Sequence, residues 1–174
     1  MSNESPVSLE LHHEIEQFYF REARLLDDYA LRDWLQTVVD PEIRYQVTNQ
    51  EERFHRDRRP AEGGVLYVND DNYGVLEMRV RQFESGLQSM LDPLQRLRRF
   101  VSNVSAFHGE QAGEFTVHCN GLVMRHRRLY EAEQVVYARK DRLRRAEDGS
   151  LRVLARHVSL DERVLRNKNL MFFL

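Results

Sequence analysis

The second half of the sequence consists of long segments of β-strand character separated by short breaks. These segments span residues 97–107, 114–127, 134–144 and 151–160. The breaks between them lie at His108-Gly109, Arg128-Leu129 and Asp148-Gly149. Long strands joined by short turns predict an antiparallel meander, so this half of the chain is expected to form one curved sheet.

The first half has the spacing of helices instead. From Ser8 onward, apolar residues recur at helical intervals, at Leu11, Ile15, Phe18, Leu25, Leu26 and Tyr29. Polar residues occupy other positions of the same helix, namely His12, Glu16, Arg21 and Glu22. This pattern predicts an amphipathic helix with one face directed at the core.

Two shorter elements are predicted to follow this helix. Asp27-Asp28 offers an N-cap for a short helix that carries Trp34 and Leu35, and Asp40-Pro41 ends that segment. Alternation of apolar and polar residues over 43–47 then predicts a half-buried strand.

A charged segment and a third helix complete the first half. Residues 49–64 are almost wholly charged and end in Gly63-Gly64, which predicts a long exposed loop. The run Asn69-Asp70-Asp71-Asn72 can cap a helix whose inward face carries Leu76, Val80 and Phe83.

Helices first and strands afterwards, with no repeat or linker between them, indicate one α+β domain. We expect this single domain to cover residues 1–174, with residues 1–7 as a flexible N-terminus. The predicted architecture is a curved, mainly antiparallel sheet packed on about three helices, which together form a cone with a pocket inside. A chain of this length buries about 70% of its extended surface, so its core needs neither disulfides nor a metal.

Composition argues against secretion, membrane insertion and a nucleic-acid partner. Cys119 is the only cysteine and the first ten residues are polar, so a reducing cytoplasm is expected. No apolar run approaches the roughly 20 residues of a membrane span. The net charge is −2, from 26 basic and 28 acidic residues. This balance argues against a polyanionic partner, although arginines cluster at 96–99, 125–128 and 139–145.

Arginine dominates the basic residues, because only Lys140 and Lys168 are lysine. Arginine favours planar, bidentate ion pairs. Along the strand predicted over 134–144, Asp141 shares a face with Arg139 and Arg145. Two interpretations remain open: a partly buried ion network across strands or between subunits, or an exposed face whose charges are worth under about 1 kcal/mol each.

The apolar residues that end the sequence, 170–174, would expose a hydrophobic patch unless they were docked. We expect them to pack into the sheet or against a neighbouring subunit. The core is predicted to contain Trp34, Leu76, Phe83, Phe172 and Phe173. Ion pairs or interfaces are predicted for Arg79, Arg98, Arg125, Asp141 and Arg144.

A series of short motifs runs in order along nearly the whole chain. They are Glu22-Ala23-Arg24-Leu25-Leu26-Asp27-Asp28 with Trp34-Leu35, Asp71-Asn72 with Leu76 and Met78-Arg79-Val80, Asp92-Pro93 with Arg96 and Arg98, Val101-Ser102-Asn103-Val104, Arg139-x-Asp141-x-Leu143-Arg144-Arg145, Leu160-Asp161 with Val164-Leu165, and Asn169-Leu170-x-Phe172-Phe173. Taken together they resemble the small, or β, subunit of bacterial aromatic-ring-hydroxylating dioxygenases. The likeness is closer to the biphenyl, naphthalene and phenylpropionate branch than to the benzoate branch.

This resemblance implies a nuclear-transport-factor-two-like, or cystatin-like, cone and a structural, non-catalytic role. It implies three copies of this chain assembled with three catalytic α subunits. The α subunit is expected to carry a Rieske [2Fe-2S] cluster and mononuclear Fe(II), and to make cis-dihydrodiols with dioxygen and electrons from NADH. No cofactor is expected in this chain.

The cysteine count independently supports the expectation that this chain holds no Rieske cluster. A Rieske centre needs two cysteines and two histidines, and this chain has one cysteine. His12 and Glu16 lie one helical turn apart and could share a metal, but a solvated helix face explains them more simply.

A stand-alone dehydratase or isomerase with the same cone is the main alternative. Such enzymes use a buried acid or base whose pKa is shifted by its surroundings. Asp28, Tyr45 and His108 are the candidates in this sequence. Each also has a structural explanation, as a helix cap, a core aromatic and a turn residue respectively.

Overall fold

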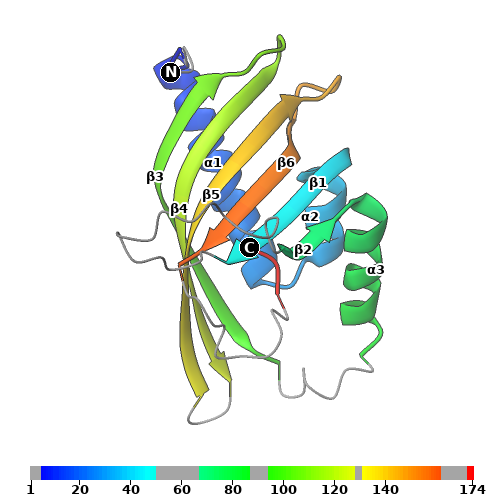
Figure 1. Ribbon diagram of the computed structural model, residues 1–174. Helices are drawn as coiled ribbons and strands as arrows, with labels where there is room; N and C mark the ends of the chain where they lie inside the picture. Colours follow the sequence, from blue (N-terminus) through cyan, green and yellow to red (C-terminus); the bar gives the residue numbers. More distant parts are fainter. Residues whose placement is uncertain (1–4, 50–66, 87–93, 128–130, 162–171) are drawn as a thin grey trace, which may run out of the picture.

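A computed structural model of the chain describes residues 5–49, 67–86, 94–127, 131–161 and 172–174 (Figure 1). Its elements, in chain order, are α1 (Leu9–Asp27), α2 (Leu31–Thr37), β1 (Val39–Asn49), β2 (Tyr67–Asp71), α3 (Tyr73–Glu84), β3 (Arg96–His108), β4 (Glu114–Arg127), β5 (Glu131–Arg145) and β6 (Leu151–Leu160). No helix in the described ranges is both long enough and apolar enough to cross a membrane.

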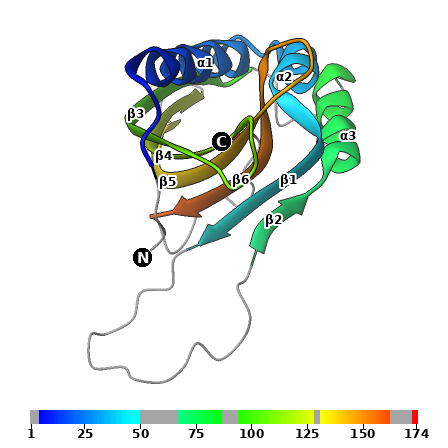
Figure 2. The same cartoon turned by 90° about the horizontal axis from the view of Figure 1, so that it is seen from above.

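The strands form one sheet in the order β2-β1-β6-β5-β4-β3. Strands β3 to β6 pair antiparallel with their neighbours in sequence, which confirms the predicted meander. Strand β1 lies parallel to β6, and β2 lies antiparallel to β1. The sheet curls around the helices, which lie on one of its sides (Figure 2). The architecture is therefore the predicted α+β cone.

The first helix begins where the sequence predicted. The Ser8 side chain accepts a hydrogen bond from the Leu11 N–H at 3.3 Å and caps α1. One prediction about this helix is wrong, because Glu22 lies on its buried face together with Ile15, Phe18 and Leu26. The helix therefore carries a carboxylate into the core.

The predicted N-cap of the second helix is also wrong. Asp28 lies at the C-terminal end of α1, and α2 is preceded by Ala30, which has no capping side chain. The carboxylate of Asp27 is instead engaged by Arg99, whose main-chain N–H and Nη1 lie 3.1 and 2.7 Å from it. Tyr29, with φ of 57°, turns the chain between the two helices.

The first strand is longer than predicted. β1 begins at Val39, so Asp40-Pro41 lies within it rather than ending the preceding segment. Pairing with β6 shifts register between Val39 and Arg44, and this irregularity accommodates the proline. The predicted loop over 49–64 lies outside the described residues, apart from Asn49 at the end of β1.

The third helix confirms its predicted cap and face. The Asn72 side chain accepts a hydrogen bond from the Val75 N–H at 3.1 Å, as an N-cap residue does. Leu76 and Val80 are fully buried, and Phe83 packs against the same core.

The segment before α1 pairs with the edge strand β3. The Val7 N–H donates to the Ala106 carbonyl at 3.2 Å, and the His108 N–H donates to the Ser5 carbonyl at 2.9 Å. Residues 1–4 of the predicted flexible terminus lie outside the described residues. Residues 5–7 are thus hydrogen-bonded to the sheet, because β3 is an edge strand with free main-chain groups.

Candidate functional site: a buried ion network beneath the C-terminal residues

Four charged side chains lie inside the cone, between the helices and the sheet. Glu22 comes from α1, Arg139 and Asp141 from β5, and Arg156 from β6, and none is more than 4% exposed. The strand residues are buried because they lie on the inner face of the sheet. Apolar residues two positions along the same strands, such as Leu143 and Val158, share this face. Two positive and two negative charges therefore share one interior site.

Arg156 is the centre of this network. Its Nε and Nη2 donate to the two oxygens of Asp141 at 3.0 and 2.8 Å. Its Nη1 and Nη2 donate to the two oxygens of Glu22 at 2.7 and 2.9 Å. This planar guanidinium thus links helix α1 to two strands with charge-assisted, bidentate geometry.

Further polar groups complete the network. Arg139 places Nη1 3.4 Å from Glu22 and Nε 3.3 Å from Asp141, and its guanidinium lies over the Tyr19 ring at 4.6 Å. The Tyr19 hydroxyl donates to Asp141 at 3.0 Å, and the Trp34 indole N–H donates to Glu22 at 3.1 Å. The two carboxylates are thus held by two cations and two neutral donors.

The balance of burial and charge fixes the ionisation of the network. Burial alone would raise the pKa of Glu22, but Arg156 and Arg139 outweigh it and hold this pKa at about 2. Burial raises the pKa of Tyr19 well above its ordinary value, and the nearby charge of Asp141 adds to the rise. Burial opposes the charge of Arg156, yet Asp141 and Glu22 raise its pKa. The Glu22 carboxylate is therefore ionised beside the guanidinium group of Arg156.

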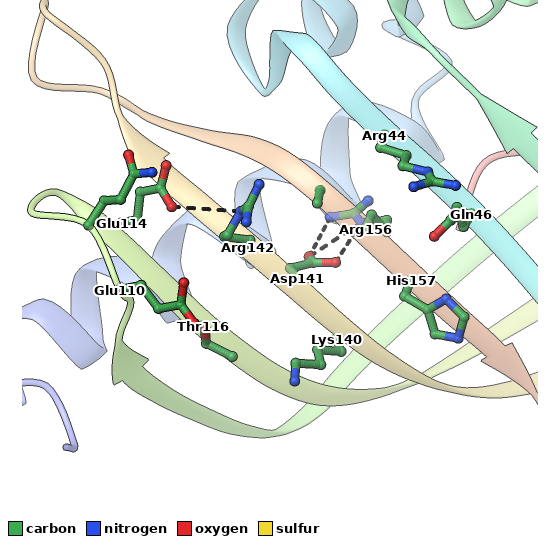
Figure 3. Close-up of a pocket in the computed structure, with 12 residues that line it drawn as sticks. Arg44, Gln46, Glu110, Glu114, Thr116, Lys140, Asp141, Arg142, Arg156 and His157 are labelled. Atoms are coloured by element: carbon green, nitrogen blue, oxygen red, sulfur yellow. Dashed lines mark hydrogen bonds and ion pairs between the residues drawn. The ribbon is translucent and has the colours of Figure 1, made fainter. Parts of the chain in front are cut away.

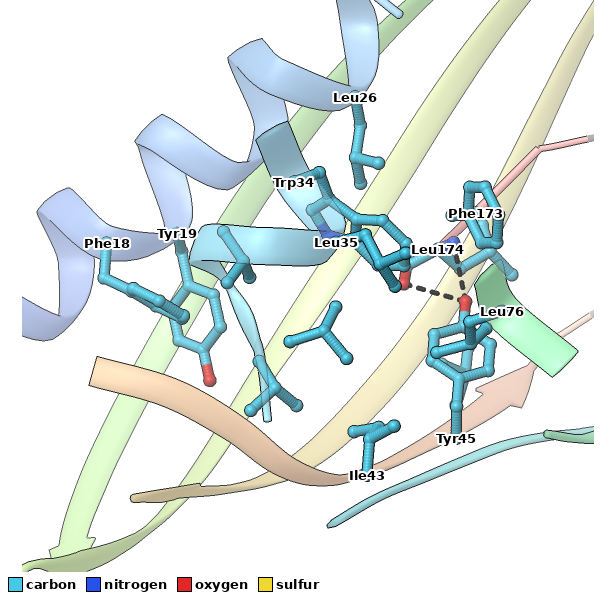
Figure 4. Packing of buried hydrophobic residues seen from close by; sticks show 14 of the residues in the cluster. Phe18, Tyr19, Leu26, Trp34, Leu35, Ile43, Tyr45, Leu76, Phe173 and Leu174 are labelled. Atoms are coloured by element: carbon cyan, nitrogen blue, oxygen red, sulfur yellow. Dashed lines mark hydrogen bonds between the residues drawn. The ribbon is translucent and has the colours of Figure 1, made fainter. Parts of the chain in front are cut away.

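Residues Phe172, Phe173 and Leu174 cover this network. The Tyr45 hydroxyl accepts a hydrogen bond from the Leu174 N–H at 2.8 Å and donates to the main-chain oxygen of Leu174 at 3.0 Å (Figure 4). Arg156 Nη1 donates to the same oxygen at 3.0 Å. The end of the chain is thereby connected to the ion network.

The Phe173 ring packs between aromatic and cationic groups. Its centroid lies 4.6 Å from that of Trp34 and 6.0 Å from that of Phe83. The Arg79 guanidinium lies 4.5 Å from the ring centroid and pairs with Asp71 at 2.6 Å. Arg99 Nη2 donates to the Phe173 carbonyl at 2.7 Å. Phe173 is therefore a core residue, as predicted.

A pocket was predicted inside the cone, and the described residues there pack against one another. The aromatic residues, the ion network and residues 172–174 pack together in the described part of this space. Every charge in the network already faces an opposite charge. This arrangement suits a structural role, because an acid or base must reach a substrate before it can transfer a proton.

The three alternative catalytic candidates are not brought together. Tyr45 is buried and engaged by Leu174. Asp28 is exposed at the end of α1, whereas His108 hydrogen-bonds to Ser5, just before α1 begins. A helix of 19 residues is about 28 Å long, so Asp28 and His108 lie near opposite ends of α1.

Other residues predicted for ion pairs form contacts of very different kinds. Arg125 lies 2.7 Å from Glu133, and Arg144 lies 2.7 Å from Glu42. Arg98 is largely exposed and lies 3.7 Å from Asp27. Subunit interfaces at these positions stay predictions. Among the described residues, no three His, Cys, Asp or Glu side chains gather as metal ligands would.

The sequence analysis missed two members of the network, Glu22 and Arg156. The signal for Glu22 was its position one turn after Phe18 and one turn before Leu26 on the buried face of α1. The signal for Arg156 was its spacing of two and four residues from Val158 and Leu160, which places it on the same buried face of β6. Of the two interpretations of Asp141, the buried network is the observed one, with Arg156 in place of Arg145.

The low pKa of Glu22 predicts acid sensitivity. A depressed pKa adds stability that is present above the ordinary value of 4.5 and is lost as pH falls toward 2. We expect the unfolding free energy to fall by about 3 kcal/mol across this window through Glu22 alone. Urea unfolding at pH 7 and pH 3 measures the part of this loss that falls above pH 3, about 2 kcal/mol. The Glu22→Gln variant should show a shallower pH dependence, and an unchanged dependence would contradict the assignment.

Comparison with known proteins gives consistent matches. Residues 21–167 match the family model described as "Ring hydroxylating beta subunit". A solved structure of naphthalene 1,2-dioxygenase, with indole bound in its active site, contains a chain that is 31% identical to this one. That match has a TM-score of 0.90 and covers 97% of this chain and 88% of the other.

Two more distant structures bear on the fold alone. The β subunit of the benzoate 1,2-dioxygenase from Burkholderia mallei is 19% identical, with a TM-score of 0.69 and coverage of 91% of this chain and 95% of that one. A Nostoc punctiforme protein with a cystatin-like fold is 17% identical, with a TM-score of 0.56 and coverage of 91% and 97%. They confirm the cystatin-like cone predicted from the sequence.

Proposed function

The chain belongs to the ring hydroxylating β-subunit family, and from this membership we propose that it supports cis-dihydroxylation of an aromatic compound by a catalytic α subunit. The chain is itself the non-catalytic β subunit of such a dioxygenase. The family match over residues 21–167 is the observation that carries this conclusion. The described interior of the cone supports it, since the buried carboxylates of Glu22 and Asp141 are paired with Arg156.

The proposed assembly contains three copies of this chain and three α subunits. The similarity to a chain of naphthalene 1,2-dioxygenase supports an assembly with a catalytic subunit and an aromatic hydrocarbon as substrate. The proposal includes a Rieske [2Fe-2S] cluster and mononuclear Fe(II) in the α subunit, NADH as the electron source, and a cytoplasmic location. A Rieske cluster does not fit this chain, because Cys119 is its only cysteine.

Iron content and turnover test this division of labour. We expect the purified chain to be colourless, to hold no stoichiometric iron, and to leave an arene unchanged in the presence of NADH and a reductase. Adding the α subunit should produce cis-dihydrodiol. Metal analysis by mass spectrometry and product analysis by chromatography measure both. Tightly bound stoichiometric iron, or turnover by this chain alone, would contradict the proposal.

A further inference from the structure

The outer face of the sheet, opposite the helices, carries a hollow that the proposed function does not use. Side chains from β1, β4, β5 and β6 surround it, including Gln46, Lys140 and His157 (Figure 3). A second hollow adjoins it, because Lys140 and His157 line both, and His118 and Asn120 line the second. The two hollows thus meet at the middle of the sheet.

Three cationic or ionisable donors stand side by side where the hollows meet. In the strand register, Lys140 of β5 lies directly opposite His118 of β4 and His157 of β6. Directly opposed residues have Cβ atoms about 4.5–5.5 Å apart. An ammonium group and two imidazole rings can therefore approach the same bound group, since each can donate hydrogen bonds. His157 Nε2 lies 3.4 Å from the Thr48 hydroxyl, so this ring would offer its other nitrogen.

The carboxylate next to this row on the central strands, Asp141, belongs to the inner face, where it pairs with Arg139 and Arg156. The neighbouring rows on the same face of β4 and β5 pair Thr116 with Arg142 and Asn120 with Ala138. Within these rows of the described sheet, β4, β5 and β6 thus contribute no acidic side chain. Among the described residues, Lys140 itself makes no ion pair.

The acidic residues around the hollow are distant or already engaged. Glu114 is four residues from His118 along β4, about 13 Å away, and it pairs with Arg142 at 3.7 Å. Glu110 lies beyond Glu114, in the β3–β4 turn. Asp70 lies three strands from Lys140, about 14 Å away, and it accepts a hydrogen bond from Gln46 at 3.2 Å. None of these carboxylates compensates the central row.

We infer that Lys140, His118 and His157 form a binding site for a carboxylate group on the outer face of the sheet. The Lys140 ammonium group has no opposite charge beside it among the described residues, and ammonium–carboxylate hydrogen bonds are among the stronger ones in proteins. The carboxylate is either a free small ion or a side chain of a neighbouring subunit. Binding of a free ion would be independent of the proposed function. A side chain of a neighbouring subunit would place a subunit interface at this face, and this possibility rests on the proposed function.

The free-ion source is tested on the full chain with acetate. Chloride is replaced by acetate at constant ionic strength, while NMR follows the ring protons of His118 and His157. Saturable shifts are expected. The Lys140→Gln variant should weaken acetate binding about tenfold or more, because it removes the charged donor. An Arg24→Gln control removes the same charge from the exposed side of α1 and should leave binding unchanged.

The subunit source is tested on the assembled complex. The Lys140→Gln variant is mixed with the α subunit, and the dissociation constant is compared with those of the unmodified chain and the Arg24→Gln control. A loss of about tenfold or more assigns the carboxylate to a neighbouring subunit. Unchanged assembly with weakened acetate binding assigns it to a free ion. Unchanged assembly together with unchanged or undetectable acetate binding would overturn the inference. Turnover by the complex reports separately on the proposed function.

Discussion

Replacing Arg156 by methionine is expected to lower the unfolding free energy by about 3–5 kcal/mol, the range for breaking a buried ion pair from one side. The variant leaves Glu22 and Asp141 buried with only Arg139 as a cationic partner. It also removes a donor from the main-chain oxygen of Leu174. Urea unfolding at pH 7, followed by circular dichroism, measures the effect.

Two further variants make this prediction specific. Arg142→Met removes an arginine from the same sheet whose side chain is 54% exposed, and it should cost under about 1 kcal/mol. Adding Glu22→Gln to Arg156→Met should recover part of the lost stability, because it removes an uncompensated buried charge. Equal losses in the Arg156 and Arg142 variants would show that the network contributes little.

Replacing Phe173 by alanine is expected to cost about 3–5 kcal/mol, as truncation of a fully packed core aromatic does. The ring contacts Trp34, Phe83 and Arg79 in the interior of the cone. Trp34 is the only tryptophan, so its fluorescence reports directly on this contact. A red shift of the native emission should accompany the loss in unfolding free energy.

Phe100 provides the matched control for this variant. It is also a phenylalanine, but it is 51% exposed on β3. The Phe100→Ala variant should change stability by about 0.5 kcal/mol or less, and it should leave the Trp34 emission unchanged. Similar costs for the two variants would contradict a role of the C-terminal residues in the core.

The features that could be predicted from the sequence are those set by local patterns. The long strands follow from alternation and turn residues, and the Asn72 cap follows from a side chain three residues before its donor. Asp27 shows where local reasoning fails, because a distant arginine, Arg99, engages a carboxylate that also suits an N-cap. Tertiary contacts therefore override capping preference at this position.

The ion network could be predicted only in part, for the same reason. Asp141 and Arg139 are two residues apart on one strand, so their shared face is a property of β5 alone. Glu22 and Arg156 are separated by 134 residues, and only the complete fold brings them together. The pairing of Phe173 with Trp34 likewise depends on how the chain end returns to the helices.

A stable complex with a catalytic α subunit tests the central claim most directly. Native mass spectrometry of the two chains, purified separately and mixed, determines both association and stoichiometry. A non-catalytic β subunit should be recovered in a complex with equal numbers of the two chains, three of each in the proposed assembly, and arene oxidation should require the mixture. No complex, together with oxidation or isomerisation of a substrate by this chain alone, would contradict the account.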